Sequence, residues 1–184
     1  MSESDSNNIT IRFYEELNDF LPSECRNIDF VHPIFKGQTV KDLIESLGVP
    51  HTEVDLIRVN GESVAFIYQL KYDDHISVYP VFERFDISKV TRLRPEPLGE
   101  ILFIVDSHLT KLARYLRMLG FDTLHNNRYE DAKIAQIAEH ERRIVLTRDR
   151  ALLMRRVITH GRYVRNTDPQ KQLQEIVDWL ELTN

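Results

Sequence analysis

Near the middle of the chain lies the run Ile101-Leu102-Phe103-Ile104-Val105-Asp106, which is apolar throughout until it stops at a carboxylate. A short, continuous apolar run of this kind is typical of a strand buried on both faces of a parallel sheet. A helical pattern follows at once, with apolar residues at positions 109, 112, 113, 116 and 119. Ligands of open α/β sheets bind in the crevice beyond the carboxyl ends of the strands. We therefore expect Asp106 to lie at such a crevice.

A second strand pattern, residues 144–146, runs through Thr147 and Arg148 into Asp149 in the same way. Between the two strands, residues 121–124 read as a short strand and residues from 131 onward as a helix. After Asp149, residues 150–156 read as helical, 162–164 as extended, and Asp168-Pro169 as the capped start of a final helix. This alternation predicts an α/β domain with a mostly parallel sheet and helices on both faces. Two acids from distant parts of the chain are then expected to converge.

The first half of the chain has a different pattern. Residues 9–13 alternate apolar and polar, 29–34 are extended, and Thr39 caps an amphipathic helix that ends at Gly48. Residues 54–59 and 62–66 flank Asn60-Gly61, a strong hairpin signal, and a last strand covers 76–81. Strand, strand, helix, strands is the order of an α+β, ubiquitin-like β-grasp domain. The predicted layout is a β-grasp domain at 9–83, a Pro-containing linker at 84–99 and an α/β domain at 100–182.

The β-grasp pattern resembles the ubiquitin-like sulfur carriers, whose chemistry needs a free Gly-Gly carboxyl terminus. Here the last predicted strand continues into Pro80-Val81-Phe82-Glu83 and about half of the chain follows. We therefore interpret this half as a binding or regulatory module that contacts a protein partner, since folds host many functions and the site decides.

Composition and charge limit the location, the metal sites and the substrates that this protein can have. The 184 residues contain no long apolar segment and no signal-peptide pattern, so we expect a cytoplasmic protein without a membrane partner. Cys25 is the only cysteine, which excludes an intrachain disulfide and a Cys-x-x-Cys zinc site. The formal net charge is −8 over residues 1–100 and +3 over residues 101–184. The basic half carries the converging acids, as a site that cleaves a polyanion requires, although a solvated helix face gives the same charge.

The sequence motifs of several nucleotide-binding and hydrolytic enzyme classes are absent. The chain has neither Gly-x-Gly-x-x-Gly nor a P-loop, and neither a Gly-x-Ser-x-Gly elbow nor His-Glu-x-x-His. The acids Asp106, Asp131 and Asp149 remain. Clustered carboxylates repel one another and tend to hold a cation, and oxygen ligands favour Mg²⁺ or Mn²⁺. The alternative is helix capping for Asp106 and Asp149 and dipole compensation for Asp131, while Asp122 and Glu130 read as surface acids.

Four segments together resemble the Mut-7 C-terminal RNase family, a branch of the PIN-like nucleases. They are residues 104–123 (IVDSHLTKLARYLRMLGFDT), Glu130-Asp131 with residues 144–153 (IVLTRDRALL), and residues 164–169 (VRNTDP). The resemblance implies a PIN-like α/β/α fold and Mg²⁺- or Mn²⁺-dependent cleavage of RNA, with Asp106, Asp131 and Asp149 as the metal-holding acids. The first half is similar to the ubiquitin-like domain that bacterial members carry. Some PIN-like relatives have a fourth acid where this chain has Ala151, and many members end in a four-cysteine zinc ribbon that is not found here.

Basic side chains near these acids are candidate RNA contacts, namely Arg114 and Arg117 on the predicted helix and Arg148 and Arg150 beside Asp149. Each would bind phosphate and so position the RNA backbone without reading its sequence. Tyr115, Tyr129 and Tyr163 are interpreted first as core aromatics, with stacking on unpaired bases as the alternative.

The sequence thus predicts a metal-dependent ribonuclease in which a β-grasp module precedes the nuclease domain. Two alternatives stay open. One is an RNA-binding adaptor whose site no longer cleaves. The other is a toxin-like nuclease that is restrained by its own acidic first half.

Overall fold

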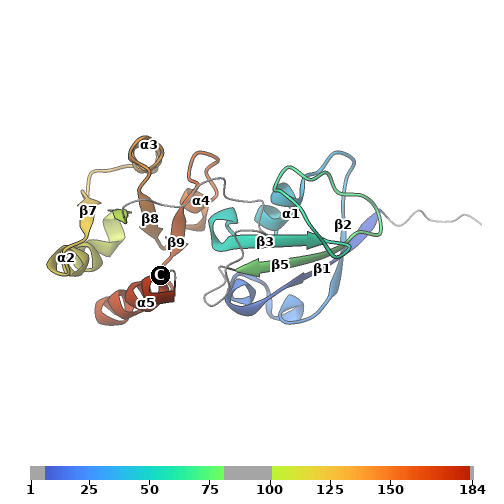
Figure 1. Cartoon of the computed structure of the whole chain (residues 1–184), viewed down its shortest axis with the longest axis horizontal. Helices are drawn as coiled ribbons and strands as arrows, with labels where there is room; N and C mark the ends of the chain where they lie inside the picture. The colour runs from blue at the N-terminus through green and yellow to red at the C-terminus, as the bar shows by residue number, and fades with distance from the viewer. Residues whose placement is uncertain (1–6, 81–100, 183–184) are drawn as a thin grey trace, which may run out of the picture. The chain divides into compact units, whose positions relative to one another are not determined.

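A computed structural model of the chain describes residues 7–80 and 101–182. The chain divides into two compact units, residues 1–95 and 96–184, which are taken one at a time (Figure 1). The predicted linker at 84–99 and both predicted domain boundaries next to it lie outside the described residues. No helix within the described ranges is long and apolar enough to cross a membrane.

The first unit is built on one mixed five-stranded sheet in the order β2-β1-β5-β3-β4. The two central strands, β1 and β5, are parallel, and every other pairing is antiparallel. This order, with one helix between the first and second strand pairs, confirms the predicted β-grasp domain. The elements are β1 (Asn8–Phe13), β2 (Phe30–Pro33), α1 (Val40–Ser46), β3 (Val54–Val59), β4 (Glu62–Ser63) and β5 (His75–Pro80), with 3₁₀ turns η1 (Glu15–Phe20), η2 (Ser23–Cys25) and η3 (His51–Glu53).

Helix α1 begins where the sequence predicts, because Thr39 and Asp42 form a reciprocal capping box. The predicted strand at 62–66 is shorter than expected and ends at Ser63. The reason is a competing set of backbone bonds, since the amides of Val40 and Lys41 donate to the carbonyls of Tyr68 and Phe66. The segment after β4 therefore turns back to the start of α1 and does not continue alongside β3.

The second unit has a four-stranded, all-parallel sheet in the order β7-β6-β8-β9. It confirms the predicted α/β fold. The elements are β6 (Leu102–Val105), the 3₁₀ turn η4 (Ser107–Leu109), α2 (Thr110–Met118), β7 (Asp122–His125), α3 (Asp131–Glu141), β8 (Ile144–Thr147), α4 (Arg150–Leu153), β9 (Gly161–Tyr163) and α5 (Pro169–Leu182).

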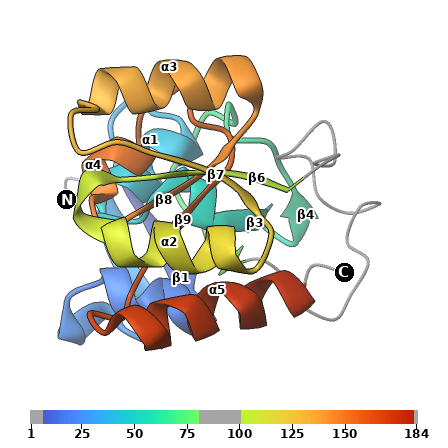
Figure 2. The ribbon, with the colours of Figure 1, turned by 90° about the vertical axis from the view of Figure 1, so that its left-hand side faces the viewer.

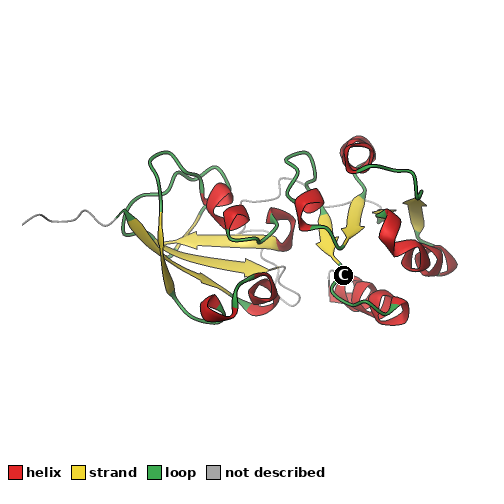
Figure 3. Ribbon diagram, turned by 180° about the vertical axis from the view of Figure 1, so that it is seen from behind, coloured by secondary structure: helices red, strands yellow, loops and turns green. Residues whose placement is uncertain are grey.

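Helices cover both faces of this sheet, which gives three layers (Figures 2 and 3). Helices α2 and α5 pack on one face, where Leu112, Leu116 and Ile176 are fully buried with Phe103. Helices α3 and α4 pack on the other face, where Ile134, Leu152 and Leu153 meet Ile104 and Val145. A strand buried on both faces explains why the β6 and β8 sequences are apolar at consecutive positions.

The strand order places a topological switch point between β6 and β8. Strand β7, which follows β6 through α2, lies on one side of β6. Strand β8, which follows β7 through α3, lies on the other side of β6. Ligands of open α/β sheets bind at such a point, beyond the carboxyl ends of the two strands.

Candidate active site

Asp106 and Asp149 flank this switch point, as the sequence predicts. Strands β6 and β8 pair in register through Val105 and Leu146, and the backbone amide of Asp106 donates to the Leu146 carbonyl at 3.0 Å. Asp106 is the first residue after β6, and Asp149 is the second residue after β8. The two acids therefore lie at the same edge of the sheet, on neighbouring strands.

The carboxylate of Asp106 is buried, with 6% of the residue exposed, and it is held by neutral donors. Its Oδ2 accepts a hydrogen bond from the Thr147 hydroxyl at 2.8 Å, and its Oδ1 accepts one from the Ser107 hydroxyl at 3.1 Å. Asp106 occupies the N-cap position of η4, but its side chain makes no capping bond there. The capping alternative therefore does not account for this side chain.

Thr147 joins the two acids. It is fully buried, and its hydroxyl accepts a hydrogen bond from the Asp149 amide at 2.9 Å while donating to Asp106. The Asp149 side chain does cap α4, because its Oδ1 accepts from the Ala151 amide at 2.8 Å. Thr147 is the residue that sequence reasoning missed. Its signal was a hydroxyl at the last position of an otherwise apolar strand, two residues before an acid.

Asp131 lies apart from this pair. It is the first residue of α3, its side chain is 45% exposed, and its Oδ2 lies 3.9 Å from Nη2 of Arg155. Within the described residues, no group of three or more His, Cys, Asp or Glu side chains is placed to hold a metal ion. The structure thus connects Asp106 and Asp149 but does not gather all three predicted acids.

The oxygen atoms at this site can be compared with the ligands that the predicted Mg²⁺ or Mn²⁺ requires. Asp106 and Asp149 offer carboxylate oxygens, which are the ligands that Mg²⁺ and Mn²⁺ prefer. Mg²⁺ is commonly bound by only one or two carboxylates, and substrate phosphates and water complete its shell. Asp106 and Asp149 therefore fit a substrate-completed site, whereas Asp131 would have to leave Arg155 to join them.

The four predicted RNA-binding arginines differ in their surroundings. Arg114 is exposed on α2. Arg117 is also on α2, but its Nε donates to the Thr123 carbonyl at 2.8 Å. Arg148 Nη1 donates to the three successive carbonyls of residues 164–166, at 2.6–3.0 Å. The Arg150 guanidinium lies over the Tyr163 ring, 5.8 Å from its centroid.

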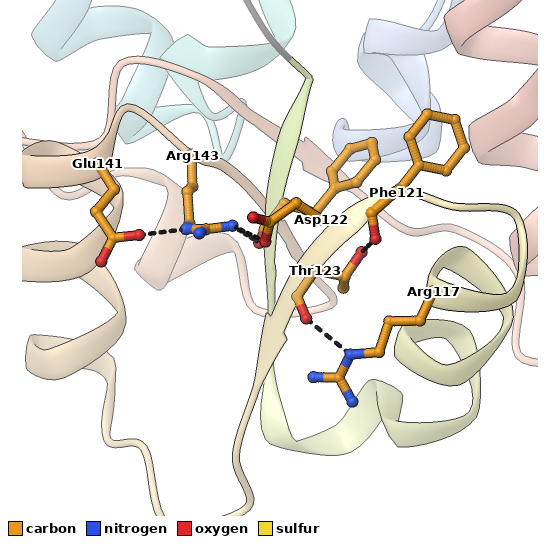
Figure 4. Close-up of polar contacts among 7 residues, drawn as sticks. Arg117, Phe121, Asp122, Thr123, Glu141 and Arg143 are labelled. Carbon is orange, nitrogen blue, oxygen red and sulfur yellow. Dashed lines mark hydrogen bonds and ion pairs between the residues drawn. The ribbon is translucent and has the colours of Figure 1, made fainter.

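A second polar cluster lies at the opposite, amino edge of the sheet (Figure 4). Arg143 is only 7% exposed, and its guanidinium bonds Asp122 Oδ1 and Glu141 Oε2, both at 2.7 Å, and the Phe103 carbonyl at 3.1 Å. The hydrogen bond from Arg143 lowers the pKa of Asp122 below its ordinary value. Asp122 is thus bound in an ion pair away from the candidate site, in agreement with its interpretation as a surface acid.

Comparisons with known protein families agree with the division of the chain into two units. The Mut7-C ubiquitin family matches residues 6–86, and the Mut7-C RNAse domain family matches residues 101–184. The resemblance predicted from the motifs is therefore confirmed. A solved structure, the crystal structure of H. volcanii small archaeal modifier protein 1, is 15% identical over 40% of this chain and 95% of that chain, with a TM-score of 0.32. The comparison with curated proteins gives no match.

Proposed function

Since the chain belongs to the Mut7-C RNAse family, with a Mut7-C ubiquitin domain ahead of the RNAse domain, we propose that it hydrolyses RNA phosphodiester bonds with Mg²⁺ or Mn²⁺ at Asp106 and Asp149. The observation that supports this proposal best is the Thr147 hydroxyl at the switch point of the sheet, which donates to the Asp106 carboxylate and accepts from the backbone amide of Asp149. A bound ion of this kind polarises a phosphoryl oxygen and lowers the pKa of a coordinated water.

The residues of the chain would provide position and charge. The Asp106 carboxyl group accepts hydrogen bonds from two hydroxyl groups, which orient its oxygens towards a bound cation without bringing a positive charge of their own. Arg114, exposed on α2, would contact phosphate and position the RNA backbone. Arg150 would do so in addition to the contact already described, and Arg148 only by giving up some of its bonds to carbonyls. Arg117 lies beside Asp122 at the opposite edge of the sheet (Figure 4), so the structure does not place it next to the acids.

Asp131 has a conditional role in this proposal. Its ion pair with Arg155 is half-exposed and long, and such pairs contribute at most about 1 kcal/mol. Binding of an RNA phosphate to Arg155 would release Asp131 and allow it to act as a third acid. The ubiquitin-like domain is proposed to act as a binding or regulatory module for a protein partner.

The test is RNA cleavage by the full chain with Mn²⁺ or Mg²⁺. Asp106→Asn and Asp149→Asn should each lower the cleavage rate about a thousandfold, because a metal contact worth several kcal/mol is lost and each 1.4 kcal/mol is tenfold in rate. Asp131→Asn should lower the rate less, by about tenfold. Mn²⁺ binding, followed by water proton relaxation, should weaken in the same order.

Asp122→Asn is the matched control, since it removes a carboxylate from the other edge of the same sheet. It should leave cleavage and Mn²⁺ binding unchanged. Equal loss of activity in all four variants would point to misfolding and would contradict the assignment of the site.

The pairing of Asp131 with Arg155 favours one alternative, a protein that binds RNA without cleaving it. In that case the unmutated protein would bind RNA but degrade none with either ion. Asp149→Asn would then leave RNA binding and every other measured property unchanged.

A further inference from the structure

An aromatic side chain lies in the same row of strand ends as the candidate acids. Tyr163 is the last residue of β9 and pairs in register with Thr147, whose hydroxyl bonds Asp106 and the Asp149 amide. Arg150 follows Asp149 directly, and its guanidinium lies over the Tyr163 ring, 5.8 Å from the centroid. Both residues are partly exposed. A cation–aromatic pair therefore lies one strand away from the acids.

Several side chains hold the backbone of Tyr163 and of the three residues that follow it. Arg148 Nη1 donates to the carbonyls of residues 164, 165 and 166, directly after Tyr163. Glu175 of α5 accepts from the amides of Arg165 and Asn166 and from the Asn166 side chain, at 2.8–3.1 Å.

Two further bonds complete this set. Arg165 donates to the Tyr163 carbonyl at 3.2 Å, and Gln172, only 5% exposed, donates to the Asn166 carbonyl at 2.9 Å. The backbone at Tyr163 is therefore fixed by the fold. The partly exposed Tyr163 ring also packs against the core that the sheet forms with α3 and α4, so its place at the strand ends does not depend on a ligand. A rigid first contact of this kind reduces the entropy that binding costs.

We propose that Arg150 and Tyr163 form a stacking subsite for a nucleobase of an unpaired RNA strand, next to the phosphate that is cleaved. This inference rests on the proposed function and adds the form of the substrate to it. Single-stranded RNA is recognised by stacking its bases on aromatic rings and on guanidinium planes, which tolerates any base identity. A base inside a duplex is already stacked on its neighbours and is not available to this pair.

The Arg150–Tyr163 pair would act on RNA differently from the arginines that contact only phosphate. Phosphate contacts act on every nucleotide alike, whereas a stacking subsite acts on one nucleotide at a fixed distance from the cleaved bond. The enzyme should therefore be sensitive to the loss of a single base at one position of the RNA. It should cleave a strand in a duplex much more slowly than the same strand alone.

The experiment uses the full chain with Mn²⁺ and a set of short single-stranded RNAs that differ only in the position of one abasic site. For the unmutated protein, KM should rise about tenfold for one position near the cleaved bond and stay constant for the others, while kcat changes little. Tyr163→Leu and Arg150→Gln should raise KM for the intact RNA and remove this dependence on position. Tyr163→Phe should keep it, because the ring remains.

Phe121→Leu is the matched control, since Phe121 is a partly buried aromatic residue that packs against the core on the other face of the sheet, immediately before β7. It should leave the abasic profile unchanged. Cleavage that is insensitive to every abasic position, or a profile that persists in both Tyr163→Leu and Arg150→Gln, would overturn the stacking subsite and leave the ribonuclease assignment intact. Absence of cleavage of every RNA by the unmutated protein would overturn the proposed function itself, and the subsite with it.

Discussion

An aspartate carboxylate has a different kind of hydrogen-bond partner at each edge of the parallel sheet. At the amino edge, Asp122 is ion-paired with Arg143, which also bonds Glu141 and the Phe103 carbonyl (Figure 4). At the carboxyl edge, the more deeply buried Asp106 is held by the hydroxyls of Thr147 and Ser107. The same residue type therefore has a cationic partner at one edge and neutral partners at the other.

This difference separates Asp122, an acid with a structural role, from Asp106, a candidate ligand of the metal ion. An ion pair satisfies a carboxylate and leaves little charge for a ligand, whereas a hydroxyl orients the carboxylate and leaves its negative charge in place. Burial without a paired cation is costly for a carboxylate, and such sites are commonly found where a cation or a proton binds. The contrast can be tested by changing the partner of each acid, Thr147 or Arg143, and then by changing Asp122 itself.

The largest effect is expected for Thr147→Val, which keeps the shape of the side chain but removes its hydroxyl. Asp106 would lose a donor and the Asp149 amide would lose its acceptor, so both acids would be less well oriented. We expect cleavage to fall about 10- to 100-fold, which is the effect of about 1.4–2.7 kcal/mol on the barrier. The rate constant is measured in single-turnover cleavage of RNA with Mn²⁺.

Thr147→Ser provides the control, because it retains the hydroxyl and loses one methyl group. It should recover most of the rate. A Thr147→Val protein that is folded and fully active would show that the bridge between the acids has no part in positioning them.

Local sequence patterns predicted most elements of both units and the edge where two acids meet, although the predicted strand at 62–66 ends at Ser63 and the predicted helix at 150–156 ends at Leu153. The apolar runs that end at Asp106 and just before Asp149 identify buried parallel strands, and their common direction fixes which ends coincide. The β-grasp order followed from alternation, one capped helix and the Asn60-Gly61 turn. These are properties of backbone geometry, which short-range patterns determine well.

Side-chain partners at the site were predicted less well, because closeness in sequence does not set the direction of a long side chain. Arg148 adjoins Asp149, but its guanidinium bonds the carbonyls of residues 164–166. Arg117 lies away from the apolar stripe of α2, yet it bonds the Thr123 carbonyl. Asp131 begins a helix as expected, and its partner Arg155 comes from 24 positions further along the chain. Such long-range pairings emerge only once the fold is known.

An intermediate effect, on stability alone, is expected for Arg143→Met at the amino edge. The buried Phe103 carbonyl would lose a donor, and Asp122 and Glu141 would lose a cation, although both acids are about half exposed and gain hydration. We expect the free energy of unfolding to fall by about 2 kcal/mol, as measured by urea denaturation. RNA cleavage at 15 °C should stay at the level of the unmutated protein. A loss of cleavage equal to that of Thr147→Val would remove the distinction between the two edges.

The smallest effect is expected for Asp122→Asn, and it should depend on pH. Because the pKa of Asp122 is lowered in the folded state by the hydrogen bond from Arg143, its stabilising contribution is present above the ordinary aspartate value of about 4 and is lost as the pH falls through the lowered folded value. The variant should therefore be less stable than the unmutated protein by under about 1 kcal/mol at pH 7, since Asp122 is 57% exposed. The difference in unfolding free energy should shrink as the pH falls below about 4. In the Arg143→Met background the same substitution should give a much smaller pH-dependent difference, because the hydrogen bond from Arg143 is lost and only the charge of Arg117 still lowers the pKa of Asp122. If the difference persisted there in full, the pKa of Asp122 would be set by groups other than Arg143, and the amino edge would not be the ion-paired counterpart of the carboxyl edge.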